Sequence, residues 1–431
     1  EQCAAMFSSM DDAYMRERAA DVQDVAARIR RILRGEAETT LAGPCLIAAE
    51  ELTPSQTVQF PRAFVQGFLT ARGAANSHTG ILARTLGVPA VSQLPVDAQL
   101  QGRTAILNGD EGTLILDPDE DQLRAAEAGI RARQAQREAL QQLAKLPSVT
   151  KDGHAIRLYA NLAGTDDLPL LQQSGAEGVG LLRSEFLYLG RSSCPTEDEL
   201  FASYKQLVQA MDGREIIIRT LDIGADKKAD YFDLPPEDNP ALGLRAIRLC
   251  LTRPALLQTQ LCAILRASAF GNVGVMFPMV TNLEDWDEAM RLVAHCRQLL
   301  RERGEEFDPD TPFGVMFGVP SACLTAEEFV EHGCNFFLIE TNDLTQYTHA
   351  VDRDISIAER YYRPASHAMK KLIRMVVEAA REGGIPVTIC GSAVGNPVNT
   401  LQYLQLGLRS FSVSPQNLIE VKKALMNAKI K

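Results

Sequence analysis

No run of about 18 consecutive apolar residues occurs in this 431-residue sequence, so it predicts no helix that spans a membrane. Positive charge is also scarce, because 44 Lys and Arg residues are outnumbered by 55 Asp and Glu residues. The resulting formal net charge of −11 argues against a nucleic-acid-binding protein, whose binding surface is usually basic. The first residues show no basic segment followed by an apolar run, so we expect no secretory signal. The sequence also lacks an initial Met, which leads us to expect a fragment or a processed product.

Closely spaced cysteine pairs are absent as well. The sequence has nine cysteines, an odd number, and none forms a Cys-x-x-Cys motif of the kind that holds structural zinc. Most of them lie in apolar surroundings, which favours buried thiols in the reducing cytoplasm over a disulfide framework. With 46% hydrophobic and 23% charged residues, the remaining composition is typical of a globular protein with a sizeable core.

The length exceeds that of one ordinary domain and predicts two or three. Residues 1–36 carry apolar residues at helical spacing, so we expect a helical segment there. Residues 37–118 predict a small α/β domain, because apolar strand-like runs alternate with turn signals and one helix-like stretch. The runs are Cys45–Ala49, Val65–Leu69, Thr104–Leu107 and Thr113–Leu116. Residues 119–150 are expected to form a linker, with strong helix formers over 119–146; a surface helix of either neighbouring domain is an equal alternative.

Residues 151–431 alternate regularly between short apolar runs and longer amphipathic stretches. The runs are Ile156–Leu162, Gly178–Leu182, Glu215–Leu221, Val273–Phe277, Phe313–Phe317, Asn335–Ile339, Ile385–Cys390 and Arg409–Val413. Eight βα units in about 280 residues match the expected size of a (β/α)8 barrel. A doubly wound open sheet is the alternative, but no Gly-rich dinucleotide fingerprint follows any run. The predicted fold class is therefore α/β with a C-terminal (β/α)8 barrel.

Polar and charged side chains gather where the predicted barrel strands end, the place where barrels carry their active residues. They include Asn161, Arg183, Glu185, Arg219, Asp222, Lys227, Glu340, Asn342, Asp343, Arg353, Cys390 and Ser392. The planar fork of Arg matches carboxylate and phosphate oxygens, and Asp and Asn oxygens suit a hard cation such as Mg²⁺. The pattern indicates a small substrate that bears both a carboxylate and a phosphate and is bound with Mg²⁺. The alternative is that each Arg is a solvated loop residue or a structural ion pair, which three arginines at successive strand ends disfavour.

Outside the barrel, Ser77-His78-Thr79 precedes the helix-like stretch of the small domain. A Ser in this place could cap the helix and leave its amide groups to an anion. The ring nitrogens of His78 would then suit the transfer of a phosphoryl group. Because a lone His is more often structural or merely exposed, the local sequence alone favours that alternative.

Longer motifs occur in the same order as in one known family. They cover residues 14–22, 77–84, 178–186, 219–227, 239–248, 275–279, 341–348, 350–353 and 390–391, beginning with YMRERAADV and including SHTGILAR, GVGLLRSEF and RTLDIGADK. Through them the chain resembles Enzyme I of the bacterial sugar phosphotransferase system, the phosphoenolpyruvate–protein phosphotransferases. The related pyruvate phosphate dikinases and phosphoenolpyruvate synthases share the barrel and the swivelling domain. Those proteins carry a large ATP-binding domain, which we do not expect in this chain.

The resemblance implies a mechanism in which phosphoenolpyruvate binds with Mg²⁺ at the mouth of the barrel. A histidine on a swivelling domain takes the phosphoryl group and passes it to a small carrier protein, HPr. The family's roles fall on His78 as phosphoacceptor, Cys390 as proton donor to the enolate, Arg183, Arg219 and Arg353 as substrate-binding arginines, Asn342 and Asp343 as substrate ligands, Asp343 also as metal ligand, and Arg245 and Lys227 as supporting phosphate contacts. By the same resemblance, 37–118 is the swivelling phosphohistidine domain, 1–36 is a remnant of the helical HPr-binding subdomain, and the barrel forms a homodimer.

The sequence departs from the family at the metal site. The family has a metal-binding Glu in a Gly-x-Met-x-Glu-x-Pro pattern after the fifth barrel strand, where this chain has Gly318. The family's Gly before Thr-Asn-Asp is Glu340 here, a new carboxylate at a neighbouring strand end. One possibility is that Glu340 reaches the vacancy and restores a site of two carboxylates with Asp343. The other is that Glu340 points into solvent or pairs with an Arg.

Two functional hypotheses follow. The first is an active phosphotransferase with a rearranged metal site, which the retained His78, arginines, Asp343 and Cys390 favour. The second is a catalytically impaired relative that binds phosphoenolpyruvate or a partner protein in a regulatory role, which the loss of a Glu at position 318 favours.

Overall fold

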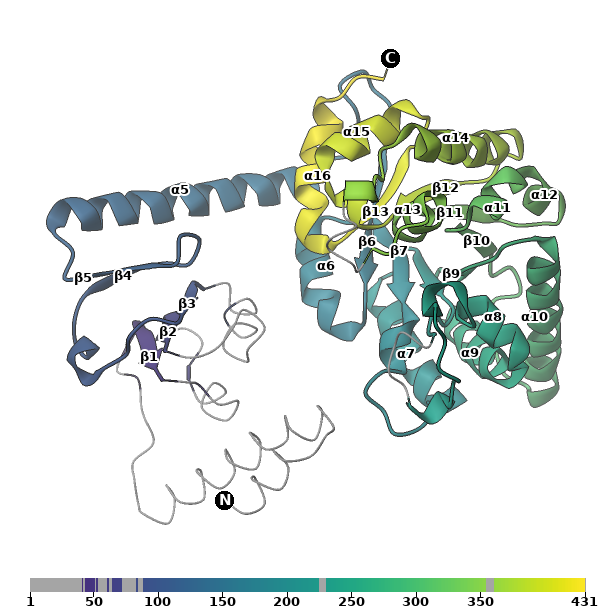
Figure 1. Ribbon diagram of the computed structural model, residues 1–431, viewed down its shortest axis with the longest axis horizontal. Helices are drawn as coiled ribbons and strands as arrows, with labels where there is room; N and C mark the ends of the chain where they lie inside the picture. The colour runs from purple at the N-terminus through teal and green to yellow at the C-terminus, as the bar shows by residue number, and fades with distance from the viewer. Residues whose placement is uncertain are drawn as a thin grey trace, which may run out of the picture. The chain divides into compact units, whose positions relative to one another are not determined.

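The computed structural model describes residues 41, 43–50, 52, 60–61, 64–71, 83, 88–224, 230–353 and 360–430 (Figure 1). The chain divides into two compact units, Glu1–Ala135 and Gln136–Lys431. The helical segment expected over 1–36 lies outside the described residues, and so do His78 and Lys227. The domain boundaries expected from the sequence stay a prediction.

The first unit contains a small parallel sheet and a separate antiparallel pair of strands. The sheet, in the order β1-β2-β3, consists of Cys45–Ala49 (β1), Val65–Thr70 (β2) and Ala90–Ser92 (β3). The pair consists of Ala105–Asn108 (β4) and Thr113–Leu116 (β5), and a 3₁₀ turn, η2, covers Ala98–Leu100. All four strands expected from the sequence form. The strand β3 escaped that prediction because three residues are too few to show an alternation.

Helix α5 spans Glu120–Lys145 and confirms the long helix expected over 119–146. At its start, Asp119 Oδ1 accepts the N–H of Gln122 at 2.8 Å, and Gln122 Oε1 accepts the N–H of Asp119 at 2.9 Å. At its end, the buried Lys422 donates from Nζ to the carbonyl oxygens of Ala144 at 2.8 Å and Leu146 at 2.5 Å. The last carbonyl groups of a helix have no partner within it, so Lys422 supplies hydrogen bonds to this end of α5, which belongs to the second unit.

The second unit is a closed barrel of eight parallel strands in the order β10-β11-β12-β13-β6-β7-β8-β9. The strands are Arg157–Leu162 (β6), Gly178–Arg183 (β7), Ile216–Arg219 (β8), Val273–Phe277 (β9), Phe313–Phe317 (β10), Phe336–Glu340 (β11), Val387–Cys390 (β12) and Ser410–Val413 (β13). Each of the eight apolar runs of the sequence overlaps one strand, and β7 and β11 end one residue beyond their runs. The closed order confirms the barrel over the open sheet.

Helices surround the barrel strands (Figure 1). They are Leu168–Ser174 (α6), Glu197–Ala210 (α7), Ala246–Thr252 (α8), Pro254–Ser268 (α9), Leu283–Arg303 (α10), Pro320–Leu324 (α11), Ala326–Glu331 (α12), Thr341–His349 (α13), His367–Glu382 (α14), Pro397–Gln405 (α15) and Pro415–Asn427 (α16). Short 3₁₀ segments cover Thr165–Asp167 (η3), Ser184–Leu187 (η4), Asp230–Phe232 (η5), Pro240–Leu242 (η6) and Ser392–Gly395 (η8). Within the described part of the chain, no helix combines the length and the apolar character that a bilayer crossing requires.

The barrel strands are buried on both faces, which explains why they read as continuous apolar runs. One large cluster packs the strands against the helices, and a smaller one fills the interior. The smaller cluster comprises Leu181, Ile217, Met276, Met316, Phe336, Leu338 and Cys390. A Cβ atom at Gly314 would lie 2.4 Å from the Phe336 ring, so the large ring requires a glycine beside it. Cys390 therefore lies at the carboxyl end of a close-packed interior.

Candidate active site

Four of the side chains expected at the site come from the last residues of barrel strands. Arg183 ends β7 and Arg219 ends β8, and the two residues pair in the parallel register. Glu340 ends β11 and Cys390 ends β12, and they pair in the same way. The carboxyl ends of all barrel strands meet at one end of the barrel, so these residues share the end where barrels carry active sites.

Arg219 is a buried cation held by two carboxylates. It is 4% exposed, its Nη2 donates to Oε1 of Glu185 at 2.6 Å, and its Nη1 lies 2.8 Å from Oδ2 of Asp222. Burial lowers the pKa of the Arg219 guanidinium, but attraction to Glu185 and Asp222 outweighs it and raises this pKa above its ordinary value. The positive charge at this strand end is therefore permanent and fixed in place.

Asp222 extends the network from Arg219 to Arg245. Its Oδ1 accepts hydrogen bonds from Arg245 Nη2 at 2.8 Å and Nε at 3.3 Å. Arg245 Nη1 donates to the Tyr347 hydroxyl at 3.2 Å and lies 3.8 Å from Oδ1 of Asp343. Burial lowers the pKa of Arg245, and the charges of Asp222 and Asp343 raise it by more. Cations and carboxylates alternate along this network, so each buried charge has an opposite neighbour.

Asp343 carries the network to the surface. It lies in the first turn of α13, and its Oδ1 accepts a hydrogen bond from Arg353 Nη1 at 3.0 Å. The side chain of Asp343 is 4% exposed, whereas that of Arg353 is 32% exposed. Arg353 is thus anchored at one end in the buried network and reachable from solvent at the other.

Glu340 adopts neither of the arrangements expected from the sequence. It is 3% exposed rather than solvated, and it forms no ion pair with another described residue. Its Oε1 accepts the N–H of Asn342 at 2.9 Å, which caps the start of α13, and its Oε2 accepts a hydrogen bond from Cys390 Sγ at 3.3 Å. Burial and then the charge of Asp343 raise the pKa of Glu340, and burial and then Glu340 raise that of Cys390 well above its usual range.

Asn342 ties α13 to the segment after β12. Its Oδ1 accepts hydrogen bonds from the backbone N–H of Ser392 at 2.9 Å and from its hydroxyl at 2.7 Å. The amide orientation of Asn342 is thereby fixed, and the loop that follows Cys390 is held against α13.

Gly318 faces Asp343. A Cβ atom at position 318 would lie 3.0 Å from Asp343 Cβ and 3.6 Å from Asp343 Oδ2. A side chain at this position would therefore extend beside the Asp343 carboxylate, from the strand end next to β11. The Glu340 carboxylate is held by other partners, so it does not take this place.

A divalent cation would find one suitable carboxylate here. The described residues contain no group of three His, Cys, Asp or Glu side chains that could hold a metal ion. Both oxygens of Glu340 have hydrogen-bond partners, while Asp343 directs Oδ2 to the side of Gly318. Mg²⁺ commonly uses one or two carboxylates together with waters and substrate phosphates. The donor set therefore fits a Mg²⁺ ion that takes most of its ligands from a substrate and water.

Sequence reasoning placed Arg183, Arg219, Arg245, Glu340, Asn342, Asp343, Arg353 and Cys390 at this end of the barrel, and the structure brings them together. Arg183 is half-buried and has no hydrogen-bond or ion-pair partner among the described residues. Lys227 and His78 lie outside the described residues. The sequence analysis assigned no role to Glu185 and Asp222 and did not single out Tyr347. Tyr347 follows Asp343 by four residues on α13, and this helical spacing is the signal that could have found it.

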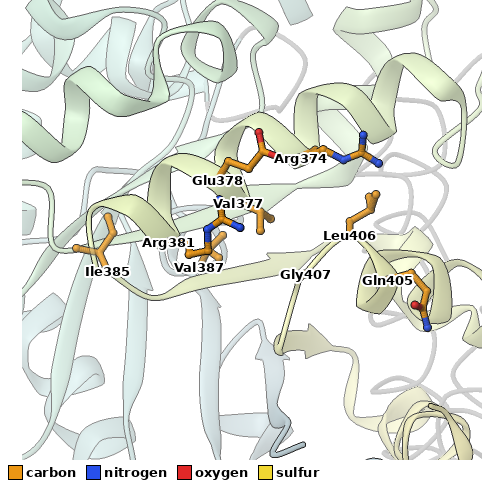
Figure 2. Close-up of a pocket in the computed structure, with 9 residues that line it drawn as sticks. All are labelled: Arg374, Val377, Glu378, Arg381, Ile385, Val387, Gln405, Leu406 and Gly407. Carbon is orange, nitrogen blue, oxygen red and sulfur yellow. The ribbon is translucent and has the colours of Figure 1, made fainter. Parts of the chain in front are cut away.

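A cavity of about 230 Å³ lies away from this cluster. Figure 2 shows Arg374, Glu378 and Arg381 on helix α14 beside it, and Leu406 near the turn that leads into β13. Val387, the first residue of β12, also lines it, so the cavity lies toward the amino ends of the strands. It contains none of the site residues and is not the site.

Comparison with known proteins agrees with the fold and the cluster. The family model described as PEP-utilising enzyme, PEP-binding domain, matches residues 137–430, and that described as PEP-utilising enzyme, mobile domain, matches residues 41–112. An α/β barrel with this residue set, preceded by a small mobile α/β domain, thus defines the class of phosphoenolpyruvate-utilising enzymes.

Comparison with individual relatives narrows this class to one family. It is 40% identical over 422 residues to a phosphoenolpyruvate-protein phosphotransferase of Bacillus subtilis (strain 168), which covers 97% of this chain and 74% of the relative. It is 39% identical over 428 residues to the protein of the same name from Priestia megaterium, with coverage of 97% and 74%. The chain belongs to the phosphoenolpyruvate-protein phosphotransferase family of enzymes, and the resemblance seen in the sequence is confirmed.

The shared carboxylate of Asp222 generates a stability prediction. Substitution Asp222→Ala leaves Arg219 and Arg245 buried without the carboxylate between them, so we expect the barrel to lose about 3–5 kcal/mol of stability. Urea unfolding followed through the fluorescence of the buried Trp286, the single Trp of the sequence, measures this in the barrel. The control is Glu382→Ala, which removes an exposed pair with Arg381 and should change stability by about 1 kcal/mol or less. Equal effects of the two substitutions would contradict the role assigned to Asp222.

Proposed function

We propose that this chain is a phosphoenolpyruvate-dependent phosphotransferase that accepts the phosphoryl group on His78 and passes it to an HPr-type carrier protein in sugar uptake. The observation that carries the proposal is the cluster of arginines at the carboxyl end of the barrel. Family membership supports the same substrate. The carrier, the histidine intermediate and a cytoplasmic location come from the family and are proposed for this chain, as is a homodimer formed through the barrel.

The arginines suit the two anionic groups of phosphoenolpyruvate. Arg forms paired hydrogen bonds to carboxylate and phosphate oxygens. Arg219 and Arg245 are locked by carboxylates, so they supply fixed positive charge rather than mobile arms. Arg183 has all its donors available among the described residues, and Arg353 reaches solvent, so these two are suited to contact the substrate directly. Lys227 and Asn342 are proposed to assist.

Mg²⁺ would be held by Asp343 together with oxygens of the substrate and water. When bound, the ion would neutralise charge on the phosphate and carboxylate of the substrate. The residues of the chain then have separate tasks. The arginines orient the phosphoryl group, and the network through Asp222 and Arg245 holds the Asp343 side chain in place.

Cys390 is proposed to supply the proton that completes the reaction. Loss of the phosphoryl group leaves the enolate of pyruvate, whose carbon C3 must take a proton. Burial and the Glu340 carboxylate raise the pKa of the Cys390 thiol, so at neutral pH it remains a thiol that carries a proton. Its position at the end of β12, in the same cluster as the arginines, suits proton transfer over a short distance.

A second candidate function is a regulatory relative that binds phosphoenolpyruvate or a partner protein without turnover. One observation favours it: Gly318 offers no carboxylate beside Asp343. The two candidates differ in whether label from phosphoenolpyruvate reaches the protein.

One test of the proposed function concerns the phosphoacceptor. Incubation with radiolabelled phosphoenolpyruvate and Mg²⁺ should give acid-labile, base-stable label, because the phosphoryl group would be on a histidine nitrogen. The substitution His78→Ala should abolish the label. His154→Ala, which changes a half-exposed barrel histidine, should retain it. Label that persists in His78→Ala would refute the assignment, and the absence of label from the unchanged chain would favour the regulatory candidate.

A further test concerns the carboxylate that is missing at position 318. Gly318→Glu places a carboxylate beside Asp343, so the affinity for Mg²⁺ in the presence of phosphoenolpyruvate should rise by about tenfold or more, which corresponds to about 1.4 kcal/mol. Gly318→Gln adds nearly the same volume without the charge and should not raise it. Calorimetric titration with Mg²⁺ compares the variants. Equal affinities in the Glu and Gln variants would show that position 318 does not face a metal site.

A further inference from the structure

Glu340 and Cys390 form a buried side-chain pair across two neighbouring strands. They lie opposite each other in the register of β11 and β12, and they are 3% and 0% exposed. Cys390 Sγ lies 3.3 Å from Glu340 Oε2, a distance at which the thiol donates a hydrogen bond to the carboxylate. The pair lies at the carboxyl end of the barrel interior, in the same cluster as Arg183 and Arg219.

The orientation of the Glu340 carboxylate is fixed by a contact that does not involve the thiol. Its Oε1 accepts the backbone N–H of Asn342 at 2.9 Å and so caps helix α13. A cap of this kind holds the carboxylate in one orientation, because the acceptor must face the first free N–H groups of the helix. With Oε1 committed to α13, Oε2 is presented to β12.

The Cys390 side chain has no comparable contact that would fix its orientation by itself. Cysteine has three staggered positions about its Cα–Cβ bond, and sulfur is a weak hydrogen-bonding group. The neighbours of Cys390 in the barrel interior, such as Met316 and Leu338, are apolar and offer no polar contact. The charges of Arg183 and Arg219 also act on the thiol, but neither side chain forms a hydrogen bond with its sulfur among the described residues. Glu340 Oε2 is the one polar side-chain atom that the structure shows bonded to this sulfur among the described residues.

We propose that Glu340 is a positioning residue that holds the sulfur of Cys390 at the carboxyl end of the barrel for proton transfer to the enolate. This inference rests on the proposed function. In the step, the S–H bond of Cys390 breaks and a C–H bond forms at C3 of the enolate, which gives pyruvate. The sulfur remains as a thiolate and then takes a proton from water. Rotation about the Cβ–Sγ bond turns the hydrogen from Oε2 to the carbon while the sulfur keeps its place.

Two substitutions distinguish positioning of the Cys390 sulfur from helix capping alone and from an effect of the Glu340 charge. Glu340→Gln keeps the length of the side chain, so it can cap α13 and contact Cys390, but it removes the charge. Glu340→Asp keeps the charge and a residue type that caps helices well, but it is one methylene shorter and falls short of the sulfur. The fluorescence of Trp286 reports whether the barrel of each variant is folded. If Glu340→Asp does not fold, Glu340→Ser, which is also a good cap and too short, takes its place.

The measured quantity is the exchange of the methyl protons of pyruvate in D₂O, followed by proton NMR with the full chain, Mg²⁺ and saturating pyruvate. This exchange reverses the protonation step and needs the thiol but not His78. We expect Glu340→Gln to exchange within about threefold of the unchanged chain. Glu340→Asp should be slower by about tenfold or more, approaching Cys390→Ala, with little change in the pyruvate concentration at half-maximal rate.

Three results would overturn the inference. Exchange by Glu340→Asp at the rate of the unchanged chain would mean that Glu340 only caps α13. Loss of exchange in Glu340→Gln but not in Glu340→Asp would mean that charge, and not reach, is what matters. No exchange by the unchanged chain would mean that it does not catalyse the proposed proton transfer between Cys390 and the enolate. The proposed phosphotransfer is judged separately by label on His78, so a labelled chain with equal exchange in all variants would leave that function standing.

Discussion

The buried carboxylate of Asp222, shared between Arg219 and Arg245, is the interaction on which the site depends. Two buried guanidinium groups at the carboxyl end of the barrel would repel each other strongly, and the carboxylate that they share offsets this repulsion and holds both in place. Through Arg245 the same arrangement reaches Asp343, and through Asp343 it reaches Arg353 at the surface. The cations needed to attract an anionic substrate are thus held in place before the substrate arrives, and binding requires little rearrangement.

The two departures from the family, at Gly318 and Glu340, can be understood together from the acidic and basic side chains of this cluster. Among the described residues, four arginines share the site with four acidic side chains: Arg183, Arg219, Arg245 and Arg353 with Glu185, Asp222, Glu340 and Asp343. By the resemblance to the family, a carboxyl group is missing at Gly318 and one is present at Glu340, so the number of acidic side chains is kept while their positions differ. The position beside Asp343 is empty of side chain, and the new carboxylate instead bonds Cys390 and the start of α13. This exchange therefore places an acidic side chain away from the proposed metal ligand and beside the proposed proton donor.

The barrel could be predicted from the sequence because each of its strands is buried on both faces, so the strands appear as apolar runs such as Val273–Phe277 and Phe313–Phe317. The strand β3 could not, because three residues carry no pattern. Most members of the site, such as Arg183, Glu340 and Cys390, could be predicted because they end those runs or follow them directly, whereas Arg245 was indicated only by the resemblance to the family. Their partners could not, because a side chain at the end of a strand finds its neighbour through the register with the next strand, as Glu340 does with Cys390. The approach of Gly318 to Asp343 depends on how α13 packs at the end of β11, which no local sequence signal encodes.

The central claim is that the arginines of this cluster bind phosphoenolpyruvate, and Arg183 tests it most directly because its removal breaks no ion pair among the described residues. Calorimetric titration of phosphoenolpyruvate with Mg²⁺ should show binding to the unchanged chain and binding weaker by about tenfold or more to Arg183→Ala, because a charge-assisted hydrogen bond contributes about 1.5–3 kcal/mol. Arg381→Ala, which alters the remote cavity of Figure 2, should bind as the unchanged chain does. Equal affinities of the unchanged chain and Arg183→Ala would contradict the account.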